Sequence, residues 1–243
     1  MSRVVVLPRL YCIVDAGSLD GVRDLAASVS EFARELIAGG ATLLQYRNKS
    51  GNPRQVLADA REILRAAEPH PGAEGRPRLI LNDRADLALL AGFDGVHVGQ
   101  EDLSPEAVRR VFGIAGRAEN ADKQTDGHSA TRNSVLGTRH SLLLGVSTHS
   151  PEQIAEADET SADYLAVGPV FATASKQNPD PVIGLEGVRR ARQLTSKPLV
   201  AIGGITRQNC RSVLDAGADS VAVISDLLRQ PRQAVEEFLR LLA

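Results

Sequence analysis

Short aliphatic runs alternate with longer segments of helical periodicity along most of this chain of 243 residues. The apolar runs predict eight strands, at 10–14, 42–46, 79–81, 95–98, 142–146, 164–167, 199–202 and 220–224. Helices are expected between the strands, over about 22–38, after Asn52, up to Gly92, after Ser104, Ser150 and Gly184, from Thr206 and from about Pro231. Regular alternation of strand and helix is typical of parallel strands covered by helices.

Helix boundaries carry recognisable signals. Asn52 precedes Pro53, Ser104 precedes Pro105, and Ser150 with Gln153 forms a potential capping box. A weak repeat places Gly39-Gly40, Gly92 and Gly217 between a helix and a strand, and Asp94, Asp163 and Asp219 directly before strands. Eight such units in about 250 residues are typical of a closed barrel. We therefore predict an α/β fold, a single (β/α)₈ TIM barrel over 1–243. An open doubly wound sheet is the alternative, but no Gly-x-Gly-x-x-Gly follows the first strand.

One segment, at about 114–141, breaks this rhythm. It is rich in Gly, Ala, Ser, Thr, Asn and charged residues and has almost no large apolar side chains. Such a segment buries too little surface to offset its ordering entropy. We predict a flexible insertion on the face of the barrel opposite to the chemistry, so that His128 and His140 have no catalytic role.

Composition and charge exclude some classes of partner. Hydrophobic residues make up 43% of the chain and aromatic residues only 3%, so aliphatic side chains supply the core. A net charge of −2 gives no electrostatic basis for binding nucleic acid or an anionic membrane. The apolar runs are too short to span a bilayer, and no signal peptide is recognisable. Cys12 and Cys210 lack metal-like spacing, which favours reduced thiols in a cytoplasmic protein. The sequence leaves open whether the protein is a homo-oligomer.

Polar side chains that folding does not require recur where the strands end. Asp83 and Asp102 follow neighbouring strands, and the carboxyl ends of parallel strands meet at one face of a barrel. Helix capping is the alternative role for an aspartate, but Ser104 already occupies the cap beside Asp102. Two carboxylates at neighbouring strand ends suit Mg²⁺, which completes its shell with water and phosphate oxygens. No His/Cys cluster favours zinc.

Cationic and hydroxyl side chains lie at other strand ends. Gln45, Arg47 and Lys49 alternate along one strand and should share a face, although an exposed basic loop is the ordinary alternative. Lys176, Thr173 and Ser175 lie in the loop after the sixth strand. Three cations and a metal ion would match a diphosphate.

A second anion site is expected near the last two strands. Gly203-Gly204 precedes an expected helix start at Thr206, and Ile224 and Ser225 would complete a phosphate site. A plain tight turn is the alternative for the two glycines. Tyr11 fits either the core or a pocket wall, His97 is expected to be a packed histidine, and His149 is a candidate for binding or for entry to the next helix.

The motifs together resemble the thiamine-phosphate synthase family. The matching pieces are QYRNK (45–49), LNDRADLAL (81–89), DGVHVGQED (94–102), LGVSTHS (144–150), DYLAVGPVFATASK (163–176), AIGGIT (201–206) and VAVIS (221–225). They occur in the family's order and cover nearly the whole chain outside 114–141. Tyr46, where the family usually has a small aliphatic residue, and Ser175, where Thr is usual, depart from the pattern.

The resemblance implies a transferase of thiamine biosynthesis. It would condense 4-amino-5-hydroxymethyl-2-methylpyrimidine diphosphate with a thiazole phosphate, or its carboxylate, to give thiamine phosphate and diphosphate by dissociative loss of diphosphate. It implies that Gln45 recognises the pyrimidine and that Asp83 and Asp102 bind Mg²⁺. It also implies a diphosphate site of Arg47, Lys49, Asn82, Ser147 and Lys176, of which Arg47, Ser147 and Lys176 are the candidate catalytic residues. The thiazole phosphate would contact Thr173, Ser175, Gly204, Ile224 and Ser225.

Two alternative functions remain at this point. One is the related branch that isomerises a thiazole carboxylate without diphosphate or metal. The other is a non-catalytic phosphate-binding barrel. The first is disfavoured by the set of Gln45, Arg47 and Lys49 and by the pair of aspartates. The second is disfavoured because a barrel that only binds phosphate would not need paired metal carboxylates.

Overall fold

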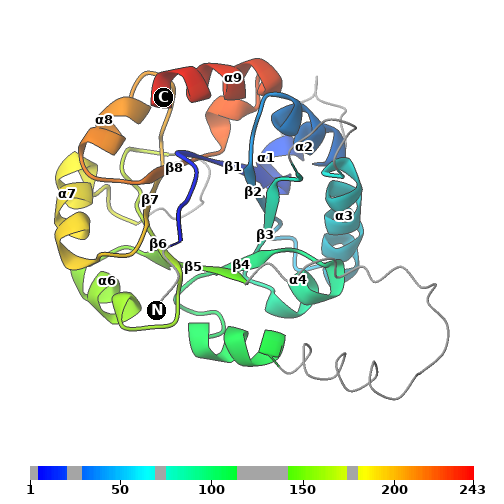
Figure 1. Cartoon of the computed structure of the whole chain (residues 1–243), viewed down its shortest axis with the longest axis horizontal. Helices are drawn as coiled ribbons and strands as arrows, with labels where there is room; N and C mark the ends of the chain where they lie inside the picture. Colours follow the sequence, from blue (N-terminus) through cyan, green and yellow to red (C-terminus); the bar gives the residue numbers. More distant parts are fainter. Residues whose placement is uncertain (1–4, 21–28, 69–74, 114–141, 174–179) are drawn as a thin grey trace.

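The computed structural model describes residues 5–20, 29–68, 75–113, 142–173 and 180–243. Eight parallel strands pair in chain order and close into a barrel, which confirms the predicted (β/α)₈ fold (Figure 1). The strands are β1 (Leu10–Asp15), β2 (Leu43–Arg47), β3 (Arg78–Asn82), β4 (Gly95–Val98), β5 (Leu143–Thr148), β6 (Tyr164–Val167), β7 (Leu199–Ile202) and β8 (Ser220–Val223). The expected insertion at 114–141 lies outside the described residues.

Helices form a ring around the strands (Figure 1). They are α1 (Ala16–Asp20), α2 (Val29–Ala38), α3 (Pro53–Ala66), α4 (Ala85–Ala91), a helix over 105–113, α6 (Pro151–Asp158), α7 (Gly184–Leu194), α8 (Cys210–Asp215), the 3₁₀ helix η1 (Ser225–Leu227) and α9 (Pro231–Leu242). The sequence did not predict α1 or η1, which are only one turn long. Of the helix expected at 22–38, residues 22–28 lie outside the described part, and the rest forms α2.

The start of α8 differs from the prediction. The helix begins at Cys210 and not at Thr206, and residues 207–209 form a turn over which the Asn209 side chain folds back. Its Oδ1 accepts the N–H of Thr206 at 2.8 Å, and its Nδ2 donates to the carbonyl of Gly204 at 3.0 Å. The prediction of a capping box at the start of α6 is also wrong in part. Ser150 accepts the N–H of Gln153, but Gln153 returns its bond to the N–H of His149, one residue earlier than the motif requires.

Alternation along the strands separates two cores. Inward-facing side chains form a cluster inside the barrel that contains Tyr11, Ile13, Leu43, Ile80, Leu143, Tyr164, Ala166, Val200 and Ala222. Outward-facing side chains pack against the helices in a second, larger cluster. Leu7, which precedes β1, belongs to the inner cluster and helps to fill the barrel interior. Cys12 and Cys210 are buried free thiols.

The aspartates that precede β4, β6 and β8 explain the weak sequence repeat. The carboxylates of Asp94, Asp163 and Asp219 accept the N–H of Leu79, Leu144 and Leu199, respectively, at 2.7–2.8 Å. The N–H of each aspartate donates in return to the carbonyl of the same leucine. An arginine pairs with each carboxylate: Arg76, Arg109 and Arg192. We call these three units the aspartate clasps. They join strand pairs at the amino ends of β3, β5 and β7.

No helix in the described ranges is long and apolar enough to cross a membrane.

Candidate active site

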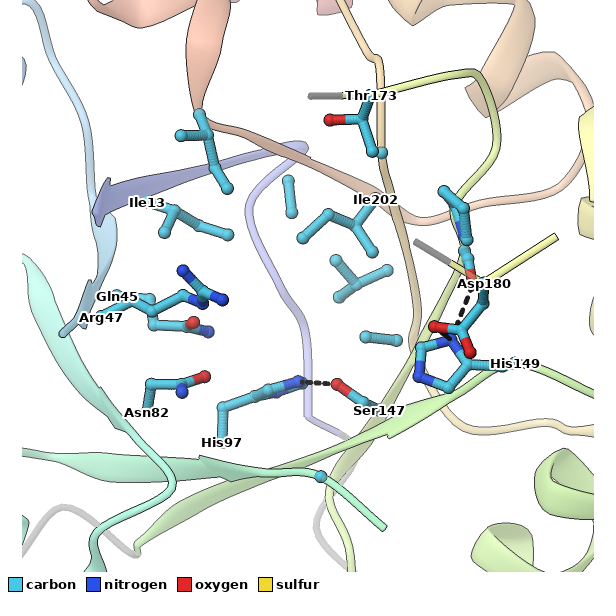
Figure 2. A pocket seen from close by; sticks show the side chains of 18 of the residues that line it. Ile13, Gln45, Arg47, Asn82, His97, Ser147, His149, Thr173, Asp180 and Ile202 are labelled. Carbon is cyan, nitrogen blue, oxygen red and sulfur yellow. Dashed lines mark hydrogen bonds and ion pairs between the residues drawn. The ribbon is translucent and has the colours of Figure 1, made fainter. Parts of the chain in front are cut away.

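A cavity of about 620 Å³ opens at the carboxyl ends of the strands (Figure 2). Most of the residues expected at the site line it: Gln45, Arg47, Lys49, Asn82, Asp83, Asp102, Ser147, Thr173, Gly204, Ile224 and Ser225. Ser175 and Lys176, expected in the loop after β6, lie outside the described residues. The expectation that these strand ends converge on one pocket is therefore confirmed for every residue that the structure describes.

The alternation predicted for the second strand places Gln45, Arg47 and Lys49 on one wall of the cavity. Gln45 lies deepest and is 4% exposed. Arg47 is half-buried, and its guanidinium donates to Asp15 Oδ2 at 2.8 Å. Asp15 is itself 3% exposed, and nothing in the sequence distinguished it. The positive charge of Arg47 is thus balanced by a buried carboxylate at the end of β1, which orients the guanidinium at the cavity wall.

Asp83 and Asp102 lie side by side at the rim of the cavity, and their carboxyl groups contact each other. Lys49 Nζ lies 2.5 Å from Asp83 Oδ2. Burial raises the pKa of Asp102, the N–H of Gly99 opposes this rise, and the neighbouring Asp83 carboxyl adds to it. Two carboxyls in contact repel each other when both are ionised, so the pair favours a nearby cation.

The backbone at Asp83 adopts an unusual conformation. Its φ is +65°, and the N–H of Arg84 donates to the carbonyl of Asn82 at 2.8 Å, which closes a γ-turn around Asp83. The Asp83 N–H donates to the carbonyl of His97 at 2.7 Å and so ties the end of β3 to β4. Asp and Asn tolerate positive φ better than most other residues. The turn carries the Asp83 carboxylate to the side of Asp102.

The donor set at this rim fits Mg²⁺. Two carboxylates are adjacent, and among the described residues no group of three or more His, Cys, Asp or Glu side chains could enclose a metal ion. Mg²⁺ is commonly held by one or two carboxylates, with water and substrate phosphate oxygens filling the other positions. Asp102 Oδ2 accepts the N–H of Gly99 at 2.7 Å, which fixes the carboxylate without a role in helix capping.

Below the rim, five side chains form an interior hydrogen-bond network. Gln45 Nε2 donates to the Tyr11 hydroxyl at 3.0 Å, and the hydroxyls of Tyr11 and Tyr164 lie 2.9 Å apart. His97 Nδ1 lies 3.0 Å from the Tyr164 hydroxyl, and His97 Nε2 lies 2.8 Å from Ser147 Oγ (Figure 2). The network runs from Gln45 to Ser147 across the barrel interior.

His97 was expected to be a packed histidine. It is buried, but it also lines the cavity and contacts Ser147. Burial lowers the pKa of His97 to about 4, although the charge of Asp102 opposes this shift. The ring is therefore neutral at physiological pH. Tyr11 belongs to the inner core cluster and also lines the cavity, so it fills both of the roles considered for it.

His149 lies on the opposite wall, where its Nδ1 is 2.8 Å from the carbonyl of Gly168 and 3.5 Å from Asp180 Oδ2 (Figure 2). The sequence suggested His149 as a candidate but not Asp180. The catalytic or binding role of His149 stays a prediction.

The two glycines after β7 have a packing role that the sequence did not reveal. Gly203 and Gly204 have φ of +100° and +63°. A Cβ on Gly203 would lie 2.5 Å from Pro169 Cβ, and one on Gly204 would lie 2.5 Å from the carbonyl oxygen of Ala172. The glycines therefore allow the loop after β6 to pack against this turn. Because α8 begins only at Cys210, the expected helix N-terminus does not directly follow them.

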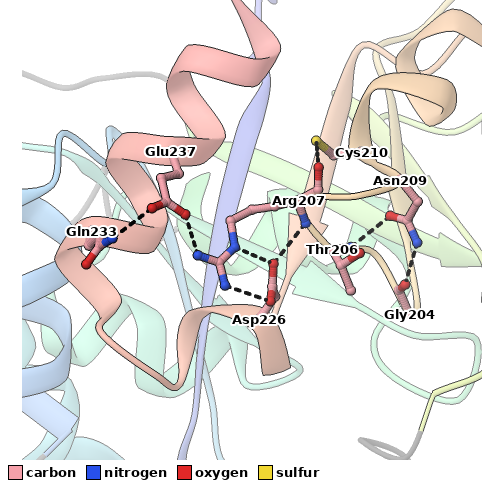
Figure 3. Close-up of polar contacts among 8 residues, drawn as sticks. All are labelled: Gly204, Thr206, Arg207, Asn209, Cys210, Asp226, Gln233 and Glu237. Atoms are coloured by element: carbon pink, nitrogen blue, oxygen red, sulfur yellow. Dashed lines mark hydrogen bonds and ion pairs between the residues drawn. The ribbon is translucent and has the colours of Figure 1, made fainter.

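An arginine on the outer side joins the two loops that flank this end of the cavity. The Arg207 guanidinium contacts both carboxylate oxygens of Asp226, and the Arg207 N–H donates to the same carboxylate at 2.8 Å (Figure 3). Glu237 of α9 pairs with the other side of the guanidinium. Asp226 belongs to η1 and follows Ser225, so this cluster fixes the turn at 203–209 relative to η1.

Comparison with known proteins gives consistent matches. The thiamine monophosphate synthase family profile matches residues 10–138 and 123–227. A thiamine-phosphate synthase of Koribacter versatilis is 54% identical over 242 residues, which are 100% of this chain and 99% of the relative. A thiamine-phosphate synthase of Chloroflexus aurantiacus is 41% identical, with 89% of this chain and 83% of the relative covered. The structure of thiamine phosphate pyrophosphorylase from Pyrococcus furiosus matches with a TM-score of 0.70 and 31% identity, over 96% of this chain and 95% of that one.

Proposed function

This chain belongs to the thiamine-phosphate synthase family, whose members are transferases of thiamine biosynthesis, and we propose how its cavity carries out the reaction. The reaction condenses 4-amino-5-hydroxymethyl-2-methylpyrimidine diphosphate with a thiazole phosphate and releases diphosphate. The observation that carries the proposal is the acidic pair of Asp83 and Asp102 beside Lys49, at the rim of the cavity that Gln45 and Ser147 line. Such a rim can hold a metal and a diphosphate above a deeper binding site.

The diphosphate end of the substrate lies at this rim. Asp83 and Asp102 would hold Mg²⁺, which supplies charge neutralisation for the leaving diphosphate when it is bound. Arg47 and Lys49 provide cations for phosphate oxygens, and Asn82 and Ser147 provide hydrogen-bond donors. Lys176 would add a third cation from the loop after β6. Asp15 orients Arg47, and Asp83 orients Lys49, so that both cations are placed before the substrate arrives.

The pyrimidine lies deeper, where Gln45 faces the cavity. Once the diphosphate leaves, the electron-rich aminopyrimidine stabilises the cation that remains, so no protein nucleophile is needed. The thiazole nitrogen then attacks this cation. Thr173, Ser175, Gly204, Ile224 and Ser225 would position the thiazole phosphate at the other side. The barrel therefore acts by placing two substrates and limiting access of water.

The direct test combines purified protein, Mg²⁺ and both precursors and measures thiamine phosphate by chromatography. We expect product and diphosphate in equal amounts, and no product when the thiazole phosphate is omitted. Diphosphate release without the coupled product would contradict the proposal, as would product formation that does not depend on a divalent cation. Assays with a carboxylated thiazole phosphate would show whether that compound is also a substrate. We also propose that both substrates are small molecules and that the protein is located in the cytoplasm.

Asp102→Ala tests the metal assignment. The substitution should abolish turnover, because one of the two carboxylates is lost, and should cost little stability, because the side chain lies at the rim. The unfolding midpoint in urea serves as the control for folding. Unchanged turnover at limiting Mg²⁺ would remove Asp102 from the metal site.

A further inference from the structure

With Gln45 Nε2 as the donor to Tyr11, the interior hydrogen-bond network of Gln45, Tyr11, Tyr164, His97 and Ser147 has one direction of proton donation that satisfies all its members. We propose that this network holds His97 as the Nε2–H tautomer, so that Ser147 turns its own proton toward the diphosphate and Gln45 turns its oxygen toward the pyrimidine amino group. Tyr11, Tyr164 and His97 are then positioning residues that act through the two substrate-binding side chains. The inference rests on the proposed function for the identity of the ligands, but the tautomer itself is a property of the free enzyme.

The direction follows from counting protons. Gln45 Nε2 donates to the Tyr11 hydroxyl and cannot accept the tyrosine's proton. Among the described contacts, the Tyr164 oxygen is the remaining acceptor for the proton of Tyr11, at 2.9 Å. The proton of Tyr164 then goes to His97 Nδ1, at 3.0 Å.

A neutral imidazole carries one proton, which must therefore be on Nε2. Nε2–H donates to Ser147 Oγ at 2.8 Å. The hydroxyl proton of Ser147 is thereby left for an acceptor in the cavity. At the other end, Gln45 uses its amide nitrogen within the network, and its amide oxygen remains for a donor.

The substrates favour the same direction. A diphosphate offers only acceptors at neutral pH, so Ser147 has to donate to it. An exocyclic amino group is a donor, so Gln45 has to accept from it. The opposite direction of the network would present a Ser147 lone pair to an anion and a Gln45 amide to an amino group, and both contacts would be repulsive.

The sequence makes room for this network. A Cβ on Gly145 of β5 would lie 2.1 Å from Tyr164 Cζ and 2.4 Å from its hydroxyl oxygen, so only glycine at this position lets the tyrosine reach across the barrel. Tyr11 is 1% exposed and Tyr164 is fully buried. The rings of His97 and Tyr164 stack with their centroids 5.6 Å apart, and the ring of Tyr11 packs edge-on against that of Tyr164. Buried hydroxyls need partners, so the network is fixed in place by the core around it.

The first experiment reads the tautomer directly. Long-range ¹H–¹⁵N correlation spectra of protein with ¹⁵N-labelled histidine distinguish a protonated ring nitrogen from a bare one, and a His97→Gln variant identifies the signals of His97. In the free wild-type protein at neutral pH we expect a single Nε2–H form. Tyr164→Phe, which removes the donor to Nδ1 but keeps the ring, should give a mixture of both tautomers. A wild-type spectrum with the proton on Nδ1 would overturn the inference, whatever the outcome of the activity assay.

The second experiment uses kinetics to separate the effects of the two ends of the network, at Ser147 and at Gln45. Tyr164→Phe should lower kcat roughly tenfold, less than the 10²–10³ lost when a donor to a developing charge is removed outright. Tyr11→Phe leaves the donor to His97 in place but releases Gln45, so it should raise KM for the pyrimidine diphosphate and keep the wild-type tautomer.

Tyr46→Phe is the matched control, because Tyr46 is the one tyrosine of the chain outside the network, and its hydroxyl pairs with Asp59 and Asn48 outside the barrel interior. It should keep the tautomer, kcat and KM of the wild type. If Tyr164→Phe matched Tyr46→Phe in both tautomer and kcat, the network would have only a packing role. If the wild type made no thiamine phosphate but showed the expected tautomer, the proposed function would fail and the assignment of the network would stand.

Discussion

Asp83 combines a functional side chain with a backbone conformation that few residues adopt. Its φ of +65° is one of two positive values at non-glycine residues in the described ranges; the other is at Gln230. Such conformations persist where the surrounding structure holds them, and here the N–H of Asp83 is tied to the carbonyl of His97. The turn places the carboxylate against Asp102, so the backbone and the charge serve the same site.

Two substitutions at Asp83 should separate these contributions. Asp83→Asn removes the charge but keeps a residue that tolerates positive φ, whereas Asp83→Ala removes both features. Both variants should lose Mg²⁺-dependent turnover. Asp83→Ala should also have a free energy of unfolding about 1 kcal/mol lower than that of Asp83→Asn, measured by unfolding in urea. Equal stabilities would mean that the turn relaxes to a negative φ in the alanine variant.

At the scale of single residues, the sequence reveals what alternation and strand ends make visible. Gln45, Arg47 and Lys49 could be placed on one wall because extended residues alternate. Asp15 and Tyr164 could not be recognised, since a single polar residue or tyrosine in a buried strand has no distinguishing neighbour in the sequence. Their partners lie far along the chain: Tyr11 and Tyr164 are 153 residues apart and meet only because the barrel closes.

The aspartate clasps act at the scale of elements, and their exposure sets an expected order of stability. The side chains of Asp94, Asp163 and Asp219 are 8%, 21% and 50% exposed. Substitution by alanine leaves a strand N–H without its acceptor, which costs about 1–3 kcal/mol when the group is buried and less when water reaches it. We therefore expect urea unfolding to show the largest loss for Asp94→Ala and the smallest for Asp219→Ala.

Asp94→Asn is the control for charge, because it keeps an acceptor oxygen for Leu79 but weakens the pair with Arg76. It should fall between wild type and Asp94→Ala. All these variants should keep their kcat at a temperature where they are folded, since the clasps lie at the face opposite to the cavity. A loss of kcat without a loss of stability would contradict this separation.

The cluster around Arg207 also acts at the scale of elements. Its loss should weaken the binding of one substrate only. Arg207→Met removes the link between the turn at 203–209 and η1, where the thiazole phosphate is proposed to bind. If the displaced loops lose about 1.4 kcal/mol of phosphate contact, KM for the thiazole phosphate rises roughly tenfold. KM for the pyrimidine diphosphate should stay close to the wild-type value.

Arg211→Met is the matched control, because Arg211 forms an exposed pair with Asp215 within the same helix and away from the cavity. It should leave both KM values unchanged. An equal rise of KM for both substrates in Arg207→Met would indicate a general disturbance of the barrel and not a local effect on the phosphate loops.

The element boundaries show where sequence patterns are reliable. Strands and the helices with a Ser or Asn cap and Pro at the first position were predicted closely, because capping and apolar periodicity agree there. The start of α8 was placed too early, because residues 207–209 form a turn before the helix, in which the Asn209 side chain bonds back to Thr206 and Gly204. The one-turn helices α1 and η1 were missed, because a single turn is too short to show a helical period.

At the scale of the whole molecule, stability and chemistry occupy opposite ends of the barrel. The clasps hold the amino ends of the strands, whereas the carboxyl ends bring carboxylates together at the cost of mutual repulsion. Sequence alone could place the cavity at the carboxyl ends, because the fold dictates this. It could also predict that Asp83 and Asp102 converge there, but not that their carboxyl groups touch, which depends on the conformation of the loops after β3 and β4. The pairing of Arg47 with Asp15 depends on the register of β1 against β2, which the sequence does not show.

This arrangement predicts how the protein responds to ligands without any turnover. Inorganic diphosphate and Mg²⁺ together should raise the melting temperature by roughly 5–10 °C at a hundred times their dissociation constant, because ligands that bind only the folded state stabilise it by mass action. Either component alone should have a much smaller effect, since the acidic pair and the cations of the rim each need the other ligand. Asp102→Ala should lose the combined shift, and Asp215→Ala, which removes an exposed carboxylate of α8, should retain it. A full shift with diphosphate alone, in the presence of a chelator, would mean that the cations bind the anion without a metal and that the two aspartates have another role.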